Sequence, residues 1–262
     1  MPRSIITLTT DFGDSSPYVA QMKGVILSIN ADATIVDITH GVPPQDIRQG
    51  AIVLSDVVES FPAGTIHVAV IDPGVGTQRS IVYLRMGDWQ FVAPNNGLQS
   101  LVAKRYPPTT MIEITNSKFW QEEISSTFHG RDIMAPVAAH LSLGLDPLQL
   151  GAEIKQLERL TMPEIQNCSN MITGTIVSFD HFGNLITDIP ADLLKDALRK
   201  GSLEIRCGSH LVRKLVHTYG EAAPPNLVAL VGSSRMLELS VVGGNAAQRL
   251  GIQVGETVSV SW

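Results

Sequence analysis

The densest group of side chains that could perform chemistry lies in residues 71–79, which read IDPGVGTQR. Asp72 follows an apolar, β-branched run, two glycines let the backbone approach a ligand closely, and Arg79 lies seven residues after Asp72. The segment lacks the Gly-Lys-Ser/Thr of a phosphate-binding loop, and no helical pattern begins directly after it, which also disfavours a dinucleotide fingerprint. Taken alone, it is equally consistent with a tight turn closed by a structural Asp–Arg pair.

A second group lies in residues 127–132, which read TFHGRD. It places His129 near an arginine and near Asp132, at the expected start of a helix that Asp132 could cap. A lone histidine in such a place is most often structural. In combination with Asp72 and Arg79, however, His129 adds a titratable imidazole to a carboxylate and a fixed cation. This set is suited to activating water without a metal ion.

Polar residues also follow other predicted strands of the first half. Residues 11–14 read DFGD and residues 93–97 read APNNG, and both segments could simply form turns. A carboxylate beside a glycine, such as Asp11, is also suited to bind the two hydroxyls of a ribose.

Two segments of the second half combine residue types that suit a small ligand. Residues 179–184 read FDHFGN, and residues 232–235 read GSSR. An aromatic ring near an amide suits a purine, while an acid and an arginine suit the amine and carboxylate of an amino acid. The structural alternatives are a β-turn over a core phenylalanine and the end of a hairpin.

The first half of the chain alternates short β-branched runs with longer stretches of helical period. This alternation predicts βαβ units around a buried, mostly parallel sheet, whose strand ends would carry the polar residues described above. We expect strands at residues 4–10, 34–40, 65–71 and 111–115, a hairpin at 81–86 and 89–93, and helices at 18–30, 47–61, 98–106 and 133–143.

The pattern weakens between Gly144 and Asn170, so we expect an N-terminal α/β domain over residues 1–160 and a smaller C-terminal domain over residues 170–262. In the second domain, short β-branched runs separated by Gly, Asn and Pro predict an antiparallel, barrel-like β domain. The expected strands are residues 173–179, 185–189, 202–207, 211–218, 227–231, 237–242 and 257–262.

Composition excludes several classes of protein. The 262 residues are 44% hydrophobic, which is enough to fill a sizeable core, and the net charge of −6 with no basic run makes nucleic acid an unexpected partner. The two cysteines, Cys168 and Cys207, are far apart and indicate neither a disulfide framework nor a zinc site. No apolar run reaches the length of a membrane span or signal peptide. We therefore expect a cytoplasmic protein without a membrane or metal partner.

Seven segments in this order resemble the S-adenosyl-L-methionine (SAM) hydroxide adenosyltransferase family, also called SAM hydrolases, which are related to the fluorinases and chlorinases. The segments read TTDFGD, DITH, IDPGVGTQR, APNNGL, TFHGRDIMAP, FDHFGN and SSR…NAA, and together they span almost the whole chain. The resemblance implies an N-terminal α/β domain, a C-terminal β-barrel-like domain and a homotrimer. It also implies that each active site lies between the first domain of one subunit and the second domain of its neighbour.

The resemblance also implies a role for individual residues. It makes Asp72, Arg79 and His129 the hydrolytic triad and Asp11 the ligand of the ribose diol. The remaining positions would bind the adenine (Phe182, Asn184 and the backbone of Ala246) and the methionine end (Asp180, Ser234 and Arg235). The implied reaction converts SAM and water to adenosine and L-methionine, with SAM as substrate and no cofactor. Either Asp72 or His129 could accept the proton of the attacking water.

Three other functions compete with SAM hydrolysis. A halogenase is disfavoured by an acid at Asp72 where fluorinases carry an aromatic residue, by His129-Gly130 where they carry Tyr-Ser, and by the short hairpin at Gly87–Asp88. Because chlorinases also carry glycine at the position of Gly130, a chlorinase-like activity stays open. A SAM- or adenosine-binding protein without turnover would need the binding residues but not the triad. A metal-dependent hydrolase is disfavoured because the seven histidines show no tight ligand spacing.

Overall fold

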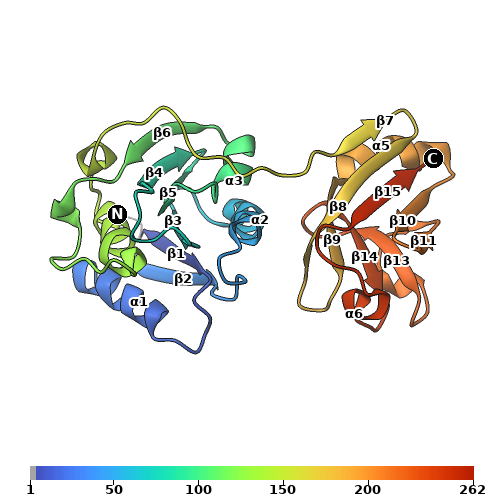
Figure 1. Cartoon of the computed structure of the whole chain (residues 1–262), viewed down its shortest axis with the longest axis horizontal. Coiled ribbons are helices and arrows are strands. Elements are labelled where there is room, and N and C mark those ends of the chain that lie inside the picture. The colour runs from blue at the N-terminus through green and yellow to red at the C-terminus, as the bar shows by residue number, and fades with distance from the viewer. Residues whose placement is uncertain (1–3) are drawn as a thin grey trace. The chain divides into compact units, whose positions relative to one another are not determined.

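A six-stranded sheet forms the centre of the first half of the chain in the computed structural model, which describes residues 4–262 (Figure 1). Its strand order is β2-β1-β3-β5-β4-β6, with β2, β1, β3 and β5 parallel and β4 antiparallel to both of its neighbours. The strands are β1 (Ile5–Thr10), β2 (Thr34–Thr39), β3 (Ile66–Val70), β4 (Ile81–Met86), β5 (Trp89–Pro94) and β6 (Pro108–Glu113). The predicted mostly parallel sheet is therefore confirmed.

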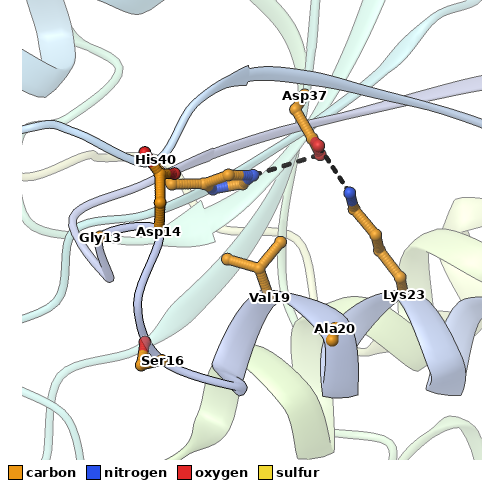
Figure 2. A pocket seen from close by; sticks show the side chains of 8 residues that line it. All are labelled: Gly13, Asp14, Ser16, Val19, Ala20, Lys23, Asp37 and His40. Carbon is orange, nitrogen blue, oxygen red and sulfur yellow. Dashed lines mark hydrogen bonds and ion pairs between the residues drawn. The ribbon is translucent and has the colours of Figure 1, made fainter.

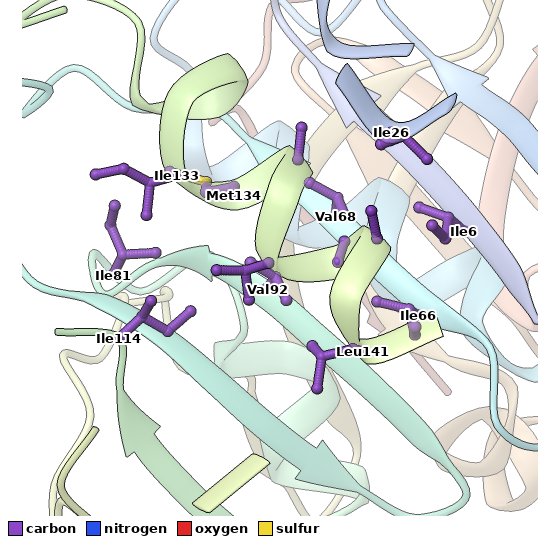
Figure 3. Close-up of a cluster of buried hydrophobic side chains, with 14 of the residues drawn as sticks. Ile6, Ile26, Ile66, Val68, Ile81, Val92, Ile114, Ile133, Met134 and Leu141 are labelled. Carbon is purple, nitrogen blue, oxygen red and sulfur yellow. The ribbon is translucent and has the colours of Figure 1, made fainter. Parts of the chain in front are cut away.

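Helices pack on both faces of this sheet and bury its β-branched strands. On one face lie α1 (Tyr18–Ile29) and α4 (Ala135–Ser142), and Figure 3 shows the cluster there, in which Ile66 of β3 lies near Leu141 of α4. On the other face, α2 (Ile47–Val57) and α3 (Ser100–Arg105) cover a second cluster. The parallel strands thus direct their carboxyl ends, and the loops that follow them, to one edge.

Two of the predicted helices differ in their ends. The helix expected over residues 47–61 is α2, which ends at Val57 and continues as a 3₁₀ turn, Val58–Ser60. The helix expected over residues 133–143 begins as a π-helical turn, Gly130–Met134, before α4. The expectation that Asp132 caps it was wrong, because Asp132 lies inside the π-helical turn and its carboxylate pairs with Ser125 and Arg131 instead.

The second unit of the chain is an almost entirely antiparallel β structure. The chain divides into two compact units, Met1–Leu160 and Thr161–Trp262. The strand order of the second is β11-β10-β15-β8-β9-β14-β13-β12, with β7 added to β8, and β11 also lies against β13, so that the sheet is nearly closed into a barrel. Only the short pair β12–β13 is parallel within this sheet. The strands are β7 (Gln166–Cys168), β8 (Met171–Phe179), β9 (Leu185–Pro190), β10 (Glu204–Cys207), β11 (His210–Val212), β12 (Leu215–Val216), β13 (Leu227–Val231), β14 (Met236–Val241) and β15 (Thr257–Ser261).

Several short elements of the second unit were not predicted from its β-branched pattern. The single strand expected over residues 211–218 is interrupted and forms β11 and β12, and the strand β7 was not expected. The helices α5 (Lys195–Lys200) and α6 (Ala246–Leu250) are five or six residues long, too short to show a helical period. Each is followed by a glycine in the left-handed conformation, Gly201 or Gly251, which is the available signal for their ends.

Within residues 4–262, none of the helices has the length and apolar character needed to cross a membrane. Both cysteines are free thiols, with Cys168 exposed and Cys207 buried.

Candidate active site

Asp72, Arg79 and His129 form one contiguous network at the edge where the parallel strands end. Asp72 follows β3, and Arg79 Nε donates to its Oδ1 at 2.9 Å while Arg79 Nη2 donates to its Oδ2 at 2.5 Å. The same Nη2 lies 2.8 Å from Nδ1 of His129. The side chains of Asp72 and Arg79 are only 5% and 11% exposed. A bidentate ion pair that is largely shielded from water fixes the guanidinium and the carboxylate more firmly than an ion pair on the surface would.

The contact with Arg79 determines the protonation of His129. A guanidinium has only N–H donors, so Nδ1 of His129 must accept through its lone pair and the hydrogen of the neutral ring is on Nε2. Burial and the positive charge of Arg79 lower the pKa of His129 from its usual 6.5, although Asp72 and Asp132 act in the opposite direction. The ring is therefore neutral near pH 7, with its Nε2–H available as a donor.

A close approach of two loops brings these residues together. The loop after β3 turns at Gly76, where φ is +75°, and a Cβ at this position would collide with the backbone carbonyl of Ser126. Within the loop, Thr77 donates from both its backbone N and its Oγ1 to Gly74 O, which fixes the turn that leads to Arg79. The sequence suggested that Gly76 lets the backbone approach a ligand. In the structure, the absence of a side chain at Gly76 is needed for contact with the loop that carries His129.

The loop that carries His129 is itself closed by Asp132. The Asp132 side chain is almost completely buried and accepts hydrogen bonds from Ser125 N at 2.8 Å and from Arg131 Nε at 2.6 Å. The guanidinium of Arg131 also lies over the ring of Phe128. These contacts give Asp132 a structural function next to the candidate triad.

The asparagines of residues 93–97 also have structural contacts. Asn96 Nδ2 donates to Ile71 O at 2.9 Å, and thereby holds the backbone just before Asp72. Asn95 accepts from Glu158 N and Asn96 accepts from Leu98 N. The structural alternative, in which this segment forms a turn, thus explains the side chains of both Asn95 and Asn96.

Asp11 lies in a separate loop, after β1, which is tied to the segment after β2. Asp11 Oδ2 accepts from Gln45 N at 2.7 Å, and Gln45 has a positive φ of 65°. The neighbouring residues of the loop contact His40, whose ring lines a pocket of about 250 Å³ (Figure 2). The other lining residues are Gly13, Asp14, Ser16, Val19, Ala20, Lys23 and Asp37. Sequence reasoning singled out Asp11 and Asp14 but missed the contacts of His40 and Gln45, since the positive φ of Gln45 has no signature in its residue type.

Aromatic side chains join the Asp11 loop to the His129 loop. The rings of Phe12 and Phe128 meet edge to face with centroids 5.7 Å apart, and Tyr18 packs against both. Because Phe12 and Phe128 are the chain neighbours of Asp11 and His129, this cluster brings the candidate ribose ligand and the candidate triad to the same region of the first unit.

In the second unit, Asp180, Phe182 and Asn184 share one tight loop. Asp180 Oδ1 accepts from the backbone N of Phe182 at 2.9 Å and of Asn184 at 2.8 Å, and its Oδ2 accepts from Asn184 Nδ2 at 2.8 Å. The carboxylate therefore orders the loop, which presents the ring of Phe182, 72% exposed, to solvent. The bond to Asp180 leaves the carboxamide oxygen and one N–H of Asn184 for another partner.

Ala246 is part of the same cluster. Ala247 N donates to Gly183 O at 3.0 Å, and a Cβ at Gly183, where φ is +82°, would collide with the side chain of Asn245. Asn245 in turn caps α6 by accepting from Gln248 N. The structure thus brings Ala246 next to the loop of Asp180, Phe182 and Asn184.

Ser234 and Arg235 lie away from that cluster. The β9–β14 register pairs Leu185 with Leu239 at one end and Pro190 with Met236 at the other. Asn184 precedes the first pair and Arg235 the second, so they are separated by the length of β9, roughly 15 Å at the usual strand rise. Arg235 also has a positive φ of 62°, and its side chain is 78% exposed.

Among residues 4–262, no three His, Cys, Asp or Glu side chains are grouped as a metal site requires.

The two units match two consecutive family profiles. Residues 6–151 match the SAM hydroxide adenosyltransferase N-terminal domain, and residues 174–259 match the C-terminal domain of the same family. A protein named (R)-S-adenosyl-L-methionine hydrolase from Salinispora tropica is 37% identical over 99% of this chain and 98% of its own length. The hydrolase of the same name from Thermus thermophilus is 36% identical over 95% of this chain and 96% of its own length.

More distant and structural relatives agree with this match. A fluorinase from an Actinoplanes species is 32% identical over 71% of each chain. The crystal structure of an uncharacterized conserved protein from Thermotoga maritima superposes with a TM-score of 0.93 at 35% identity, covering 98% of this chain and all of the other.

Proposed function

This chain belongs to the SAM hydroxide adenosyltransferase family, and on that premise we propose that it hydrolyses S-adenosyl-L-methionine to adenosine and L-methionine. The family profiles cover both units, and the hydrolases from Salinispora tropica and Thermus thermophilus align over nearly the full chain. The activity is that of a hydrolase whose substrate is SAM.

The chemistry of SAM limits what the protein must supply. Its sulfonium makes the ribose C5′ electrophilic, and methionine leaves as a neutral thioether without needing a proton or a metal ion. In the proposed step, the oxygen of water attacks C5′, the C5′–S bond breaks with its electron pair going to sulfur, and a proton of the water goes to the protein. The protein must hold the water in line with the breaking bond and accept that proton.

The observation that carries this mechanism is the Asp72–Arg79–His129 network. Nδ1 of His129 is occupied by Arg79, and its Nε2 carries the hydrogen, so the imidazole could donate that hydrogen to the water oxygen. Asp72 keeps acceptor positions beyond those used by Arg79, since a carboxylate offers about four lone-pair sites. We therefore assign proton acceptance to Asp72, orientation of the water to His129, and charge stabilisation to Arg79.

The proposed binding residues divide between the two units. In the first unit Asp11 would bind the ribose diol. In the second, Phe182, the free amide groups of Asn184 and the backbone of Ala246 would bind the adenine. Asp180, Ser234 and Arg235 would bind the methionine end; the separation of Arg235 from Asn184 means that an extended substrate would have to lie along β9 to contact both.

We further propose a homotrimer in which each active site combines the first unit of one subunit with the second unit of its neighbour. The distribution of the candidate residues over two separately folded units is the support for this assembly. A cytoplasmic location is proposed as well, in keeping with two unpaired cysteines, one of them exposed.

A product assay tests the function directly. Incubation with SAM in ¹⁸O-labelled water should give adenosine labelled at the 5′-oxygen, and equal activity after treatment with EDTA should accompany it. A buffer rich in chloride provides the test for a halogenase, whose product would be 5′-chloro-5′-deoxyadenosine. Saturable binding of SAM without any product would contradict hydrolysis and leave a binding protein.

A further inference from the structure

A chain of polar contacts crosses the edge of the first sheet and ends next to Asp11. Lys23 Nζ of α1 lies 2.5 Å from Asp37 Oδ2 of β2, and Asp37 Oδ1 lies 3.2 Å from Nε2 of His40, as Figure 2 shows. On its other side, His40 Nδ1 lies 2.9 Å from Oγ1 of Thr10, the last residue of β1. The contacts therefore connect a helix, an edge strand and the start of the Asp11 loop.

The direction of these contacts can be worked out from the donors and acceptors. A carboxylate only accepts, so the hydrogen of a neutral His40 lies on Nε2, toward Asp37, and Nδ1 accepts from the hydroxyl of Thr10. Thr10 Oγ1 in turn accepts from Phe12 N at 3.3 Å. Two hydrogen bonds through Thr10 Oγ1 thus connect the His40 ring to the backbone next to Asp11.

His40 also holds that loop through its own backbone. Its carbonyl oxygen accepts from Gly13 N at 2.8 Å, beyond Asp11 in the sequence. His40 therefore contacts the residue before Asp11, Thr10, and also Gly13, which lies after it. The carboxylate of Asp11 itself accepts from Gln45 N. The loop carries no regular secondary structure, so these bonds determine where the carboxylate points.

The burial of His40 shows that this arrangement has a cost. Its side chain is only 9% exposed, and Nε2 meets Asp37 off the direction of a good hydrogen bond, so this nitrogen is not fully satisfied. Leaving an imidazole nitrogen buried without a good hydrogen bond costs free energy. We propose that His40 is a positioning residue that fixes Asp11 for the ribose diol of the substrate, an inference that rests on the proposed function.

The inference predicts a defect in binding that depends on the diol. Holding Asp11 in place strengthens contacts that the substrate makes before and during the reaction alike, so their loss raises KM and leaves kcat within about twofold. For His40→Leu we expect about a tenfold rise in the KM for SAM and in the Kd for adenosine, the size expected when a hydrogen bond to a charged group is weakened. His40→Asn should restore most of the affinity, because its amide can occupy the position of Nδ1.

The experiment compares adenosine with 2′,3′-dideoxyadenosine by isothermal titration calorimetry. His40→Leu should weaken the binding of adenosine and leave that of the dideoxy nucleoside unchanged. Thr10→Val, which removes the hydroxyl at nearly constant shape, should give the same loss, and the double variant should lose no more than either single variant.

His67 offers a matched control on the same sheet. Its Nδ1 lies 2.8 Å from Oγ1 of Thr7, a buried pair of the same kind three residues earlier on β1. His67→Leu should lower stability without changing the Kd for adenosine, so a general loosening of the sheet is distinguished from a defect at Asp11.

Unchanged adenosine binding in His40→Leu and Thr10→Val would overturn the inference, and so would an equal loss for both nucleosides. Absence of a preference for the diol in the unsubstituted protein would do so as well. If that protein binds adenosine with a preference for the diol but does not hydrolyse SAM, the proposed function fails and the function of His40 stands.

Discussion

The proposed hydrolysis depends most on Asp72, whose carboxylate is the assigned proton acceptor. Asp72→Asn keeps the shape of the side chain but removes its charge and its capacity as a base, so we expect kcat to fall by about 10²- to 10⁴-fold. Adenosine should still bind with similar affinity, because Asp72 is assigned to the water and not to the nucleoside. Chromatographic measurement of adenosine release, together with calorimetry, checks both parts.

The control for this substitution is Asp32→Asn, which changes an exposed carboxylate in the turn before β2. It should leave kcat and KM unchanged. Because Asp72→Asn leaves the buried Arg79 without its anion, circular dichroism should accompany the assay. A folded Asp72→Asn protein with full activity would remove Asp72 from the mechanism.

The protonation of His129 predicts the acid side of the pH profile. Burial and Arg79 lower its pKa from 6.5, so the neutral ring persists as the pH falls through 6.5. Protonation would replace the acceptor at Nδ1 by a second donor facing Arg79 and break the network. We expect kcat/KM to stay level from pH 8 to 6.5 and to fall only below that; an acid limb centred at pH 7 or above contradicts this assignment.

At this scale, the sequence predicts residue types better than their contacts. Asp72, Arg79 and His129 could be selected because a carboxylate, a fixed cation and an imidazole together suit the activation of water, and the structure brings the three together. The tautomer of His129 could not be predicted, because it depends on an angle of approach between two loops. For the same reason Asp132 was expected as a helix cap and is instead a buried loop anchor.

The loop after β3 contacts the loop before α4, and adding a single methyl group at Gly76 tests whether this contact matters. Gly76→Ala would place Cβ against the carbonyl of Ser126 in addition to straining a positive φ. We expect kcat to fall by about 10- to 100-fold, because shifts near 1 Å in a catalytic group have effects of that size.

Gly144→Ala is the matched control, since Gly144 also has a positive φ but has open space where its Cβ would lie. Both variants should lose about 1 kcal/mol of stability from backbone strain, Gly76→Ala should lose more because its Cβ meets the Ser126 carbonyl, and Gly144→Ala should keep full activity. Steady-state kinetics and urea unfolding separate the two effects. Equal activity in both variants would show that the approach of the loops is not needed for catalysis.

Strand β3 contains a second pH-sensitive histidine, which affects stability. His67 is fully buried between Phe61 and Phe91, and burial lowers its pKa to about 4. Between pH 6.5 and about 4 the unfolded chain binds a proton that the folded chain does not, so stability present above pH 6.5 is lost as the pH falls. A shift of this size corresponds to about 3 kcal/mol.

Urea unfolding at pH 7 and pH 4.5 measures this loss. His67→Leu should begin less stable at pH 7, because Thr7 loses its partner, but should lose less stability on acidification. Some pH dependence should remain in both proteins, since burial also lowers the pKa values of His129 and His140. An identical fall in both proteins would contradict the assignment to His67.

The regular elements of the first unit could be predicted because the β-branched runs and the helical period are strong signals there. Ile81–Met86 and the hairpin to β5 follow directly from two such runs joined at a Gly-Asp turn. Short elements such as α5 and α6 could not, because five or six residues do not define a period. Yet α6 positions Ala246, so part of the candidate site depends on an element with almost no sequence signal.

For the whole molecule, the main consequence is that the candidate residues belong to two folding units with separate cores. The Asp72–Arg79–His129 network, to which we assign activation of water, and Asp11 lie in the first unit, and the proposed adenine contacts lie in the second. On the proposed assignment, neither unit alone would provide all of the contacts with SAM. The proposed trimer therefore makes assembly a condition of activity.

Complementation between two inactive variants tests whether neighbouring subunits share an active site. Asp72→Asn inactivates the first unit and Asn184→Ala the second, so each homotrimer should be inactive. In randomly mixed trimers, an intact site needs its first unit from an Asn184→Ala subunit and its second unit from an Asp72→Asn subunit. Each of these has a probability of about one half in an equal mixture, so about one quarter of the sites should be active. Co-expression, purification and light scattering to verify a trimer would precede the adenosine assay. If each subunit forms its own site, the mixture stays inactive, because every site then contains one of the two substitutions.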